Sequence, residues 1–158
     1  MKLLKIHVLT LVLCIFAAQS AGLIGAIFTF SAIDSWYLGL NKPFFNPPNW
    51  IFGPVWTILY SLIGISLYFV IISKNKLRSK TLKLFFIHLV LNGLWSIIFF
   101  GLKNPAVALM EILIMWTTLI YLMYLFNRFE KRAFYLFIPY LLWVTFASIL
   151  NLSIWYLN

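Results

Sequence analysis

Charged residues are scarce in this sequence, and acidic residues are almost missing. Only 9% of the 158 residues are charged, against about 25% in a typical soluble domain. Three residues are Asp or Glu, whereas 64% of the chain is hydrophobic. Such a chain cannot cover a water-facing surface with polar groups. A soluble globular domain is therefore excluded, and the high hydrophobicity also excludes intrinsic disorder.

Cysteine is equally scarce, since the sequence has one, Cys14, inside an apolar run. An intrachain disulfide and a zinc or iron–sulfur site on cysteine ligands are therefore excluded. The 12 basic residues give a formal net charge of +9, which raises the question of nucleic acid. They stand in short clusters between apolar runs and form no basic face, so we expect no nucleic-acid partner.

What the sequence has in abundance is long apolar runs. Five of them meet or approach the roughly 20 residues that an α-helix needs to cross a bilayer. Backbone in lipid must satisfy its own hydrogen bonds, so runs of this length indicate helices, and the alternation of a membrane barrel strand is absent. We predict an all-α integral membrane protein with one domain, residues 1–158, a bundle of five transmembrane helices at about 6–33, 51–73, 84–102, 105–127 and 133–157.

The first run also has features of a secretory signal. Lys2 and Lys5 precede an apolar stretch, and Ala18-Gln19-Ser20 has the small residues of a cleavage site. The apolar run continues to Ile33, however, well beyond the hydrophobic part of a usual signal peptide. The length favours a retained first helix over a cleaved one.

The basic residues predict the orientation. Ten Lys or Arg residues fall in the N-terminal segment and in the second and fourth loops, and two, Lys42 and Lys103, fall on the other side. Positive charge accumulates on the cytoplasmic side, so we expect the N-terminus inside and the C-terminus outside. Arg and Ser are rare near the N-terminus, which favours a bacterial cell membrane over an organelle.

The first loop is unusually rich in aromatic residues and proline. Pro43, Pro47 and Pro48 exclude a helix there, which leaves a stiff cap at the membrane surface. An interfacial aromatic belt is the simplest explanation of its tryptophans. A belt does not explain Trp56 and Tyr60, which lie one turn apart within the next apolar run.

Three motifs in this chain match one known family. Residues 36–60 read WYLGLNKPFFNPPNWIFGPVWTILY, residues 92–96 read NGLWS, and residues 139–143 read PYLLW. With these motifs the chain resembles the TspO/translocator protein family, the tryptophan-rich sensory proteins also called peripheral-type benzodiazepine receptors. The resemblance covers essentially the whole chain. It implies a five-helix bundle, often dimeric, with a pocket near the first loop for porphyrins such as protoporphyrin IX and for benzodiazepine-site ligands.

Helical spacing supports such a pocket independently. Asn92, Trp95 and Phe99 share one helix face, as do Trp143, Ala147 and Leu150 on the last helix. Aromatic walls suit a flat macrocycle, although the same residues also suit a packed bundle core. Combining spacing and resemblance, we predict the ligand-binding residues to be Gly22, Trp36, Tyr37, Lys42, Pro47, Trp50, Trp56, Tyr60, His88, Asn92, Trp95, Phe99, Trp143, Phe146, Ala147 and Leu150.

Polar residues near this pocket each have two interpretations. Lys42 is expected to receive a porphyrin propionate at the pocket mouth, or else to be an ordinary interfacial lysine. His88 either contacts the ligand or packs between helices with a hydrogen bond to a neighbour, and the second role is favoured. Glu111 lies within a span, where a carboxylate is costly, and a hydrogen bond between helices is favoured over a proton path.

Small residues recur in the first helix at four-residue spacing, at Ala18, Gly22 and Ala26. Such rows let helices approach closely, either in a homodimer or within the chain. Near the C-terminus, no basic residue follows Tyr156. The sterol motif proposed for animal members of the family, a weak pattern in any case, is therefore incomplete, and cholesterol binding through it is not expected.

Three functions are compatible with these observations. The first is a membrane-embedded tetrapyrrole-binding protein that acts as a sensor or scavenger, with porphyrin as ligand and no obligatory cofactor or metal. The second is a light- and oxygen-dependent porphyrin-degrading enzyme, for which Trp56 and Trp143 are the catalytic candidates. The third is a small-molecule or porphyrin transporter that couples through Glu111. The first is favoured because no triad, metal site or carboxylate pair is evident.

Overall fold

The computed structural model describes residues 2–158, and their side chains from Lys5 onward. Lys2, which contributed to the predicted orientation, therefore lies outside the described side chains. Within this range the chain forms only helices, and the predicted all-α membrane fold is confirmed. The five long helices are α1 (Lys2–Ile33), α2 (Asn49–Ile72), α3 (Arg78–Ser96), α4 (Pro105–Phe129) and α5 (Lys131–Leu157), and all are long and apolar enough to cross a membrane.

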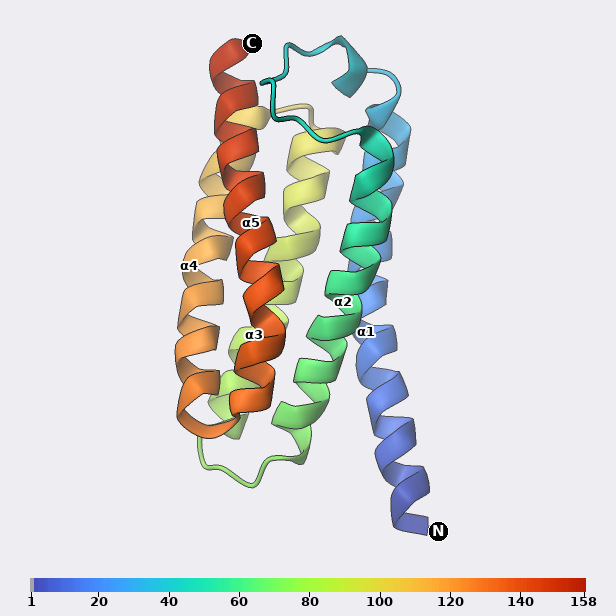
Figure 1. The fold of residues 1–158 in the computed structure, drawn as a ribbon, viewed down its shortest axis with the longest axis vertical. Coiled ribbons are helices and arrows are strands. Elements are labelled where there is room, and N and C mark those ends of the chain that lie inside the picture. Colours follow the sequence, from blue (N-terminus) through green and yellow to red (C-terminus); the bar gives the residue numbers. More distant parts are fainter. Residues whose placement is uncertain (1) are drawn as a thin grey trace.

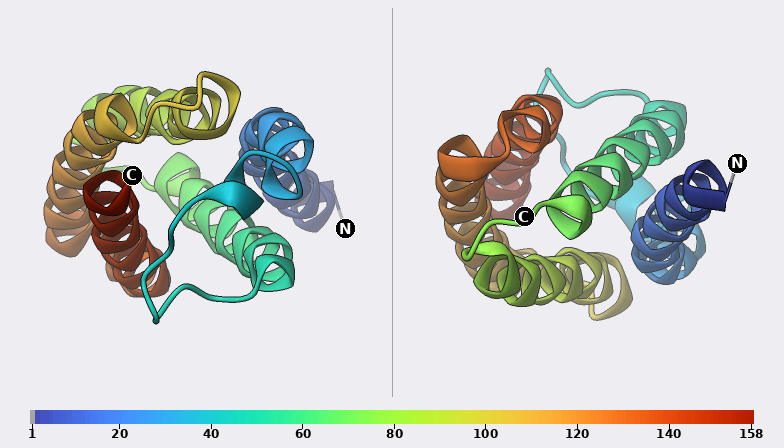
Figure 2. Two further views of the ribbon diagram at one scale, coloured as in Figure 1. Left: turned by 90° about the horizontal axis from the view of Figure 1, so that it is seen from above. Right: turned by 90° about the horizontal axis from the view of Figure 1, so that it is seen from below.

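The helices run alternately up and down and form a closed bundle (Figure 1). The N-terminus and the α2–α3 and α4–α5 connections lie at one end, and the first loop and the C-terminus lie at the other. Neighbour contacts follow the ring order α1, α2, α5, α4, α3, and α3 returns to α1. Figure 2 shows the same order along the bundle axis. This order places α2 opposite α3 and α4, so that side chains from distant parts of the sequence face one another.

Several helices are longer than the uncharged runs predicted. The third helix begins at Arg78, six residues before the predicted start at 84, and α4 continues to Phe129 rather than 127. The reason is physical. Charged residues mark where the chain leaves the hydrocarbon, but backbone hydrogen bonding continues unbroken into the headgroup region.

The end of α3 widens into a π-helical turn, η2 (Ile97–Gly101). The Leu102 N–H donates to the Ile97 carbonyl at 2.8 Å, a bond over five residues. Phe99 and Phe100 lie in this turn, and both are buried. Turns of this kind are frequent at functional sites.

Small residues bring α1 close to its neighbours. Ala18 is fully buried, and a β-carbon on Gly64 of α2 would lie 2.9 Å from the Cys14 carbonyl oxygen. On the other side of α1, a β-carbon on Gly25 would lie 3.0 Å from Ser96 Oγ of α3. The small-residue surface around Ala18, Gly22 and Ala26 therefore serves contacts within the chain, and dimerisation stays a prediction.

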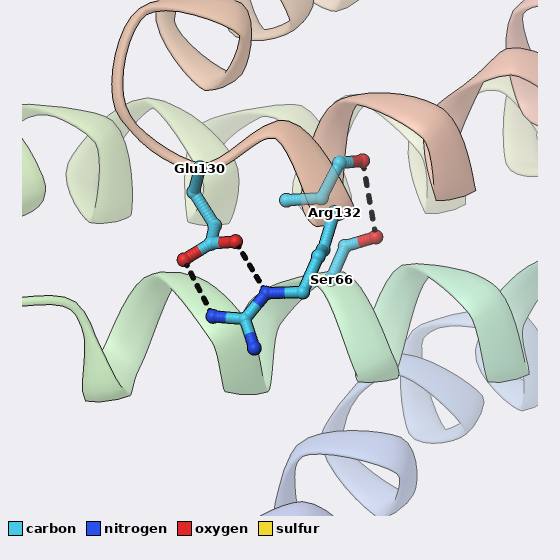
Figure 3. A network of polar contacts seen from close by, with 4 residues as sticks. Ser66, Glu130 and Arg132 are labelled. Atoms are coloured by element: carbon cyan, nitrogen blue, oxygen red, sulfur yellow. Dashed lines mark hydrogen bonds and ion pairs between the residues drawn. The ribbon is translucent and has the colours of Figure 1, made fainter.

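The start of α5 is fixed by polar contacts (Figure 3). Arg132 donates to both oxygens of Glu130, at 2.7 and 3.1 Å, and its guanidinium lies 4.2 Å from the centre of the Phe69 ring of α2. Ser66 of α2 donates to the Leu62 carbonyl of its own helix at 2.9 Å, and its hydroxyl also lies 3.5 Å from the Ala133 carbonyl oxygen of α5. The contact between Arg132 and the Phe69 ring links the start of α5 to α2.

Candidate functional site

A cavity of about 250 Å³ lies among α1, α2, α3 and α5, near the first loop. The three indoles of Trp56, Trp95 and Trp143, from three different helices, all line it. Its wall comprises Gln19, Gly22, Leu23, Ala26, Thr29, Phe30, Ile33, Tyr37, Asn49, Phe52, Gly53, Trp56, Thr57, Tyr60, Trp95, Ser96, Phe99, Phe100, Trp143, Phe146, Ala147, Leu150, Asn151 and Ile154.

Ten of the sixteen predicted residues lie on this wall. They are Gly22, Tyr37, Trp56, Tyr60, Trp95, Phe99, Trp143, Phe146, Ala147 and Leu150. Trp36, Lys42, Pro47, Trp50, His88 and Asn92 do not line the cavity. The helical spacing thus selected residues of α2 and α5 that line the cavity, whereas the predicted loop residues other than Tyr37, and His88 and Asn92 of α3, lie elsewhere.

The aromatic wall is built from stacked pairs. Trp56 stacks on Tyr60, with ring centres 5.4 Å apart and planes 29° apart. Trp95 stacks on Phe99 at 5.1 Å and 23°. Trp143 stands edge-on to Trp56 at 6.4 Å and so closes the corner between α5 and α2. Because each ring is held by another, the wall presents fixed flat faces to the cavity.

A buried hydrogen-bond network stands behind this wall. Tyr60 donates to the Asn92 side-chain carbonyl, and the Asn92 amide donates to the Tyr140 hydroxyl at 2.6 Å. His88 Nε2 lies 2.8 Å from the same hydroxyl, and its Nδ1 lies 2.8 Å from Thr118 Oγ1. Four helices are joined by this network.

The network defines the roles of His88 and Asn92. Thr118 donates its own proton to the Met115 carbonyl at 2.7 Å, so it accepts from His88 Nδ1–H. Tyr140 then donates to His88 Nε2. His88 therefore has the packed role that the sequence favoured, and Asn92 holds Tyr60 in place from behind the wall.

The first loop is stabilised by hydrogen bonds between its own residues. Tyr37 is fully buried and donates to the Asn46 side-chain carbonyl at 2.6 Å. Burial raises the pKa of Tyr37 to about 12, against a smaller opposing effect of this hydrogen bond. Lys42 Nζ donates to the carbonyls of Leu38 and Leu40, at 3.0 and 3.1 Å, and lies 4.9 Å from the Tyr37 ring centre. The ammonium of Lys42 thus stabilises the loop.

Three other loop and span predictions have clear outcomes. Trp36 packs edge-on against Phe99 at 5.7 Å and so supports the wall from outside. Trp50 is 72% exposed, as an interfacial aromatic residue would be. Pro47 lies in the loop, where its carbonyl accepts from the Asn46 amide at 3.0 Å.

Glu111 does not form the predicted hydrogen bond between helices. Its side chain is buried, yet neither carboxylate oxygen has a hydrogen-bond partner within the part of the chain that the structure describes. The prediction is wrong because the buried polar groups of α3 and α5 bond elsewhere. Trp95 Nε1, for example, donates to Asn151 Oδ1 at 3.0 Å, and the Asn151 amide donates to the Pro105 carbonyl at 2.8 Å.

Sequence reasoning missed several wall residues. Gln19 donates from its amide to the Thr57 carbonyl at 2.9 Å and to Ser61 Oγ at 3.1 Å. A glutamine inside a long apolar run was a usable signal, but its place beside two small residues suggested a cleavage site instead. Phe52 stands in the first motif, but it was not predicted to bind the ligand. The packing of α2 against α5 places its ring centre 6.2 Å from that of Trp143.

The cavity opens toward the membrane between α1 and α2. Leu23 and Phe30 of α1 line it, yet they are 64% and 75% exposed. Gly53 and Thr57 face them from α2 and are also exposed. A wall residue that is also exposed marks an opening, and these four lie on spans that the bilayer would surround.

Comparison with known proteins assigns nearly the whole chain to one family. A model of the TspO/MBR family matches residues 12–157. The chain belongs to the TspO/MBR family. The match includes most of α1, all of α2 to α5 and every residue of the cavity wall, so the resemblance drawn from the three motifs is confirmed.

Curated TspO/MBR relatives cover most of the chain. The "Tryptophan-rich protein TspO" of Archaeoglobus fulgidus is 44% identical, over 96% of this chain and 99% of its own length. The "Protein CrtK" of Rhodobacter capsulatus is 37% identical, over 90% of this chain and 88% of its own. The human "Translocator protein" is 35% identical, over 76% of this chain and 73% of its own.

Proposed function

We propose that this chain binds a flat, largely apolar ring system of the tetrapyrrole type, such as protoporphyrin IX, within the membrane. The observation that carries this proposal is the meeting of Trp56, Trp95 and Trp143 on one cavity. An aromatic pair contributes about 0.5–1.5 kcal/mol beyond the burial of its surface. A conjugated macrocycle that stacks on one of these rings meets another edge-on, since Trp143 stands at 89° to Trp56. The same wall suits benzodiazepine-site ligands.

A few polar groups accompany the aromatic wall, as is usual for ligand sites. Ser96, Thr29 and Gln19 lie on it. The Trp143 indole N–H is buried and has no acceptor among the described residues. A ring nitrogen or carbonyl of the ligand would supply that acceptor.

The size of the cavity bears on how a ligand is held. At about 250 Å³ it lies just below the roughly 300–1,000 Å³ of typical ligand pockets. A ligand of that class therefore extends into the opening between α1 and α2. Since that opening faces hydrocarbon, an apolar ligand dissolved in the bilayer reaches the cavity without crossing water.

The orientation is part of the same proposal. The two sets of loops lie at opposite ends of the bundle (Figure 1), and the basic residues collect at the end of the α2–α3 and α4–α5 connections. We propose that this end is cytoplasmic, in a bacterial cell membrane, with the cavity nearer the outer side. Protease access to tags at the two termini in sealed vesicles tests it.

Titration of the detergent-purified protein with protoporphyrin IX tests binding. Tryptophan fluorescence should be quenched to a plateau, because bound porphyrin lies against three indoles. Trp143→Phe should weaken the affinity several-fold. The matched control is Trp155→Phe, since Trp155 is half-exposed and lies off the cavity wall. Quenching without saturation, or equal effects of the two variants, would exclude the proposal.

A further inference from the structure

Four side chains form an ordered group on the outer surface of α3 and α4, here called the tyrosine–cation patch: Lys80, Tyr121, Tyr124 and Arg128. All four are exposed. The last three lie at i, i+3 and i+7 on one face of α4. The rings of Tyr121 and Tyr124 stack with centres 6.2 Å apart and planes 12° apart. Lys80 lies in the first turn of α3 and Arg128 in the last turn of α4, so the patch extends to the end of the bundle that carries the α2–α3 and α4–α5 connections (Figure 1).

Each cation in the patch is held by a tyrosine. Lys80 Nζ donates to the Tyr121 hydroxyl oxygen at 2.7 Å and lies 5.3 Å from the centre of that ring. Arg128 Nη1 donates to the Tyr124 hydroxyl oxygen at 2.8 Å, and its guanidinium carbon lies 5.6 Å from the ring centre. Two positive charges on different helices are thereby fixed beside one stacked pair of rings.

The direction of these hydrogen bonds matters. A phenolic oxygen that accepts from a cation still has its own O–H proton to donate. Lysine and arginine also have further N–H donors beyond the one used. Beside the stacked rings the patch therefore presents two cations and two O–H donors, which are groups that bind anionic oxygens such as those of a phosphate.

No carboxylate of this chain neutralises the patch. The sequence has three acidic residues. Glu130 forms an ion pair with Arg132 through two hydrogen bonds (Figure 3), and Glu111 is buried. Asp34 follows the last residue of α1, at the end of the bundle opposite the patch. An anion from outside the chain can therefore reach both cations without displacing a carboxylate of the protein.

The surface next to the patch is apolar. Ile87 lies seven residues after Lys80 on α3, and Ile114 lies seven residues before Tyr121 on α4. Because the two helices run in opposite directions, both residues lie toward the middle of the bilayer. They are 55% and 56% exposed. A headgroup on the patch therefore has room for its acyl chains beside these residues.

We propose that the tyrosine–cation patch binds the phosphate of an anionic phospholipid, such as phosphatidylglycerol, in the leaflet at this end of the bundle. The location favours a lipid over a free phosphate ion, since the cations border an apolar surface and anionic lipids attract basic residues at the interface. This site lies on the outside of α3 and α4 and is independent of the cavity.

Native mass spectrometry of the full chain tests the site, with phosphatidylglycerol and phosphatidylcholine as probes. We expect one preferred phosphatidylglycerol, and about a tenfold weaker affinity in Lys80→Gln/Arg128→Gln, because charge-assisted hydrogen bonds are lost. Tyr121→Phe/Tyr124→Phe keeps both rings and both charges, and should also weaken the binding several-fold. The matched control is Lys74→Gln/Lys76→Gln, which removes equal charge from the exposed α2–α3 connection and should change the affinity less than twofold.

Three results would overturn the proposal. Equal binding of phosphatidylcholine would remove the headgroup specificity. Equal weakening by the Lys74/Lys76 control, or none in the tyrosine double variant, would reduce the effect to general charge attraction. Displacement of the lipid by millimolar inorganic phosphate would make the patch an ion site. Circular dichroism of each variant verifies that the bundle is retained.

Discussion

The ring of Tyr60 fills the space in which a side chain at Gly22 would stand. A β-carbon at position 22 would lie 2.9 Å from Tyr60 Cζ and closer still to two other ring carbons. The ring cannot move away freely, since Trp56 stacks on it and Asn92 accepts its hydroxyl proton. A glycine on α1 is therefore part of the geometry of the cavity wall on α2.

Gly22→Ala should therefore lower both stability and ligand affinity. Overpacking of this kind costs about 1–3 kcal/mol, and a displaced Tyr60 ring would change the wall. Thermal unfolding in detergent and the protoporphyrin titration measure the two effects. Gly39→Ala is the matched control, because its added β-carbon meets nothing within 4 Å and Gly39 lies off the cavity wall. A variant at position 22 as stable as that control would contradict the close contact.

Tyr140→Phe should destabilise the bundle although it removes one atom. The Asn92 amide and His88 Nε2 would both lose their partner in a buried place, at about 1–3 kcal/mol for each unsatisfied group. Tyr135→Phe, at a tyrosine that is 61% exposed on the same helix, should leave the unfolding temperature unchanged. If both variants unfold at the same temperature, the hydrogen bonds of the network make no measurable contribution to stability.

Glu111→Leu should not lower stability. Neither carboxylate oxygen accepts a hydrogen bond in the described part of the chain, so the substitution breaks none, and it removes the cost of burying a polar group. Thermal unfolding compares it with Asn151→Leu, which breaks the bonds to Trp95 and Pro105 and should be destabilising. A marked loss of stability in Glu111→Leu would show a partner for the carboxylate.

The last residue, Asn158, should restrain the first loop. Its side chain accepts from the Asn41 N–H and donates to the Asn41 carbonyl, both at 3.0 Å. Asn158→Ala should therefore speed hydrogen exchange in residues 34–48, as followed by mass spectrometry. Ser153→Ala loses only a bond within α5 and should leave that exchange unchanged. Unaltered loop exchange in Asn158→Ala would show that other contacts hold the loop.

Tyr37 should make stability fall at high pH. Burial raises its pKa to about 12 from the ordinary tyrosine value of 10.0, so the unfolded chain loses this proton first. The contribution of Tyr37 to stability is complete below about pH 10 and declines as the pH rises toward 12. Tyr37→Phe should show a smaller decline over this range in thermal unfolding. An identical pH profile in the variant would refute the assignment.

The sequence by itself determined the class, the number of spans and the family. Uncharged runs long enough to cross a bilayer leave the backbone one local solution, a helix whose hydrogen bonds lie within the run. The three tryptophan-rich motifs identified the family, and the spacing of Trp56 and Tyr60 placed both on one face. Span length, motifs and helical spacing all depend on residues that are close together in the chain, so they can be identified from the sequence alone.

Only the tertiary structure decided which residues reach the cavity. His88 and Trp95 share a face of α3, yet the bundle turns Trp95 to the cavity and surrounds His88 with Tyr140 and Thr118. The opening between α1 and α2 and the ties of Lys42 to its own loop also depend on how distant segments pack. Helical periodicity gives the direction of a side chain on its own helix, whereas its surroundings are set by helices remote in sequence, and no local pattern records them.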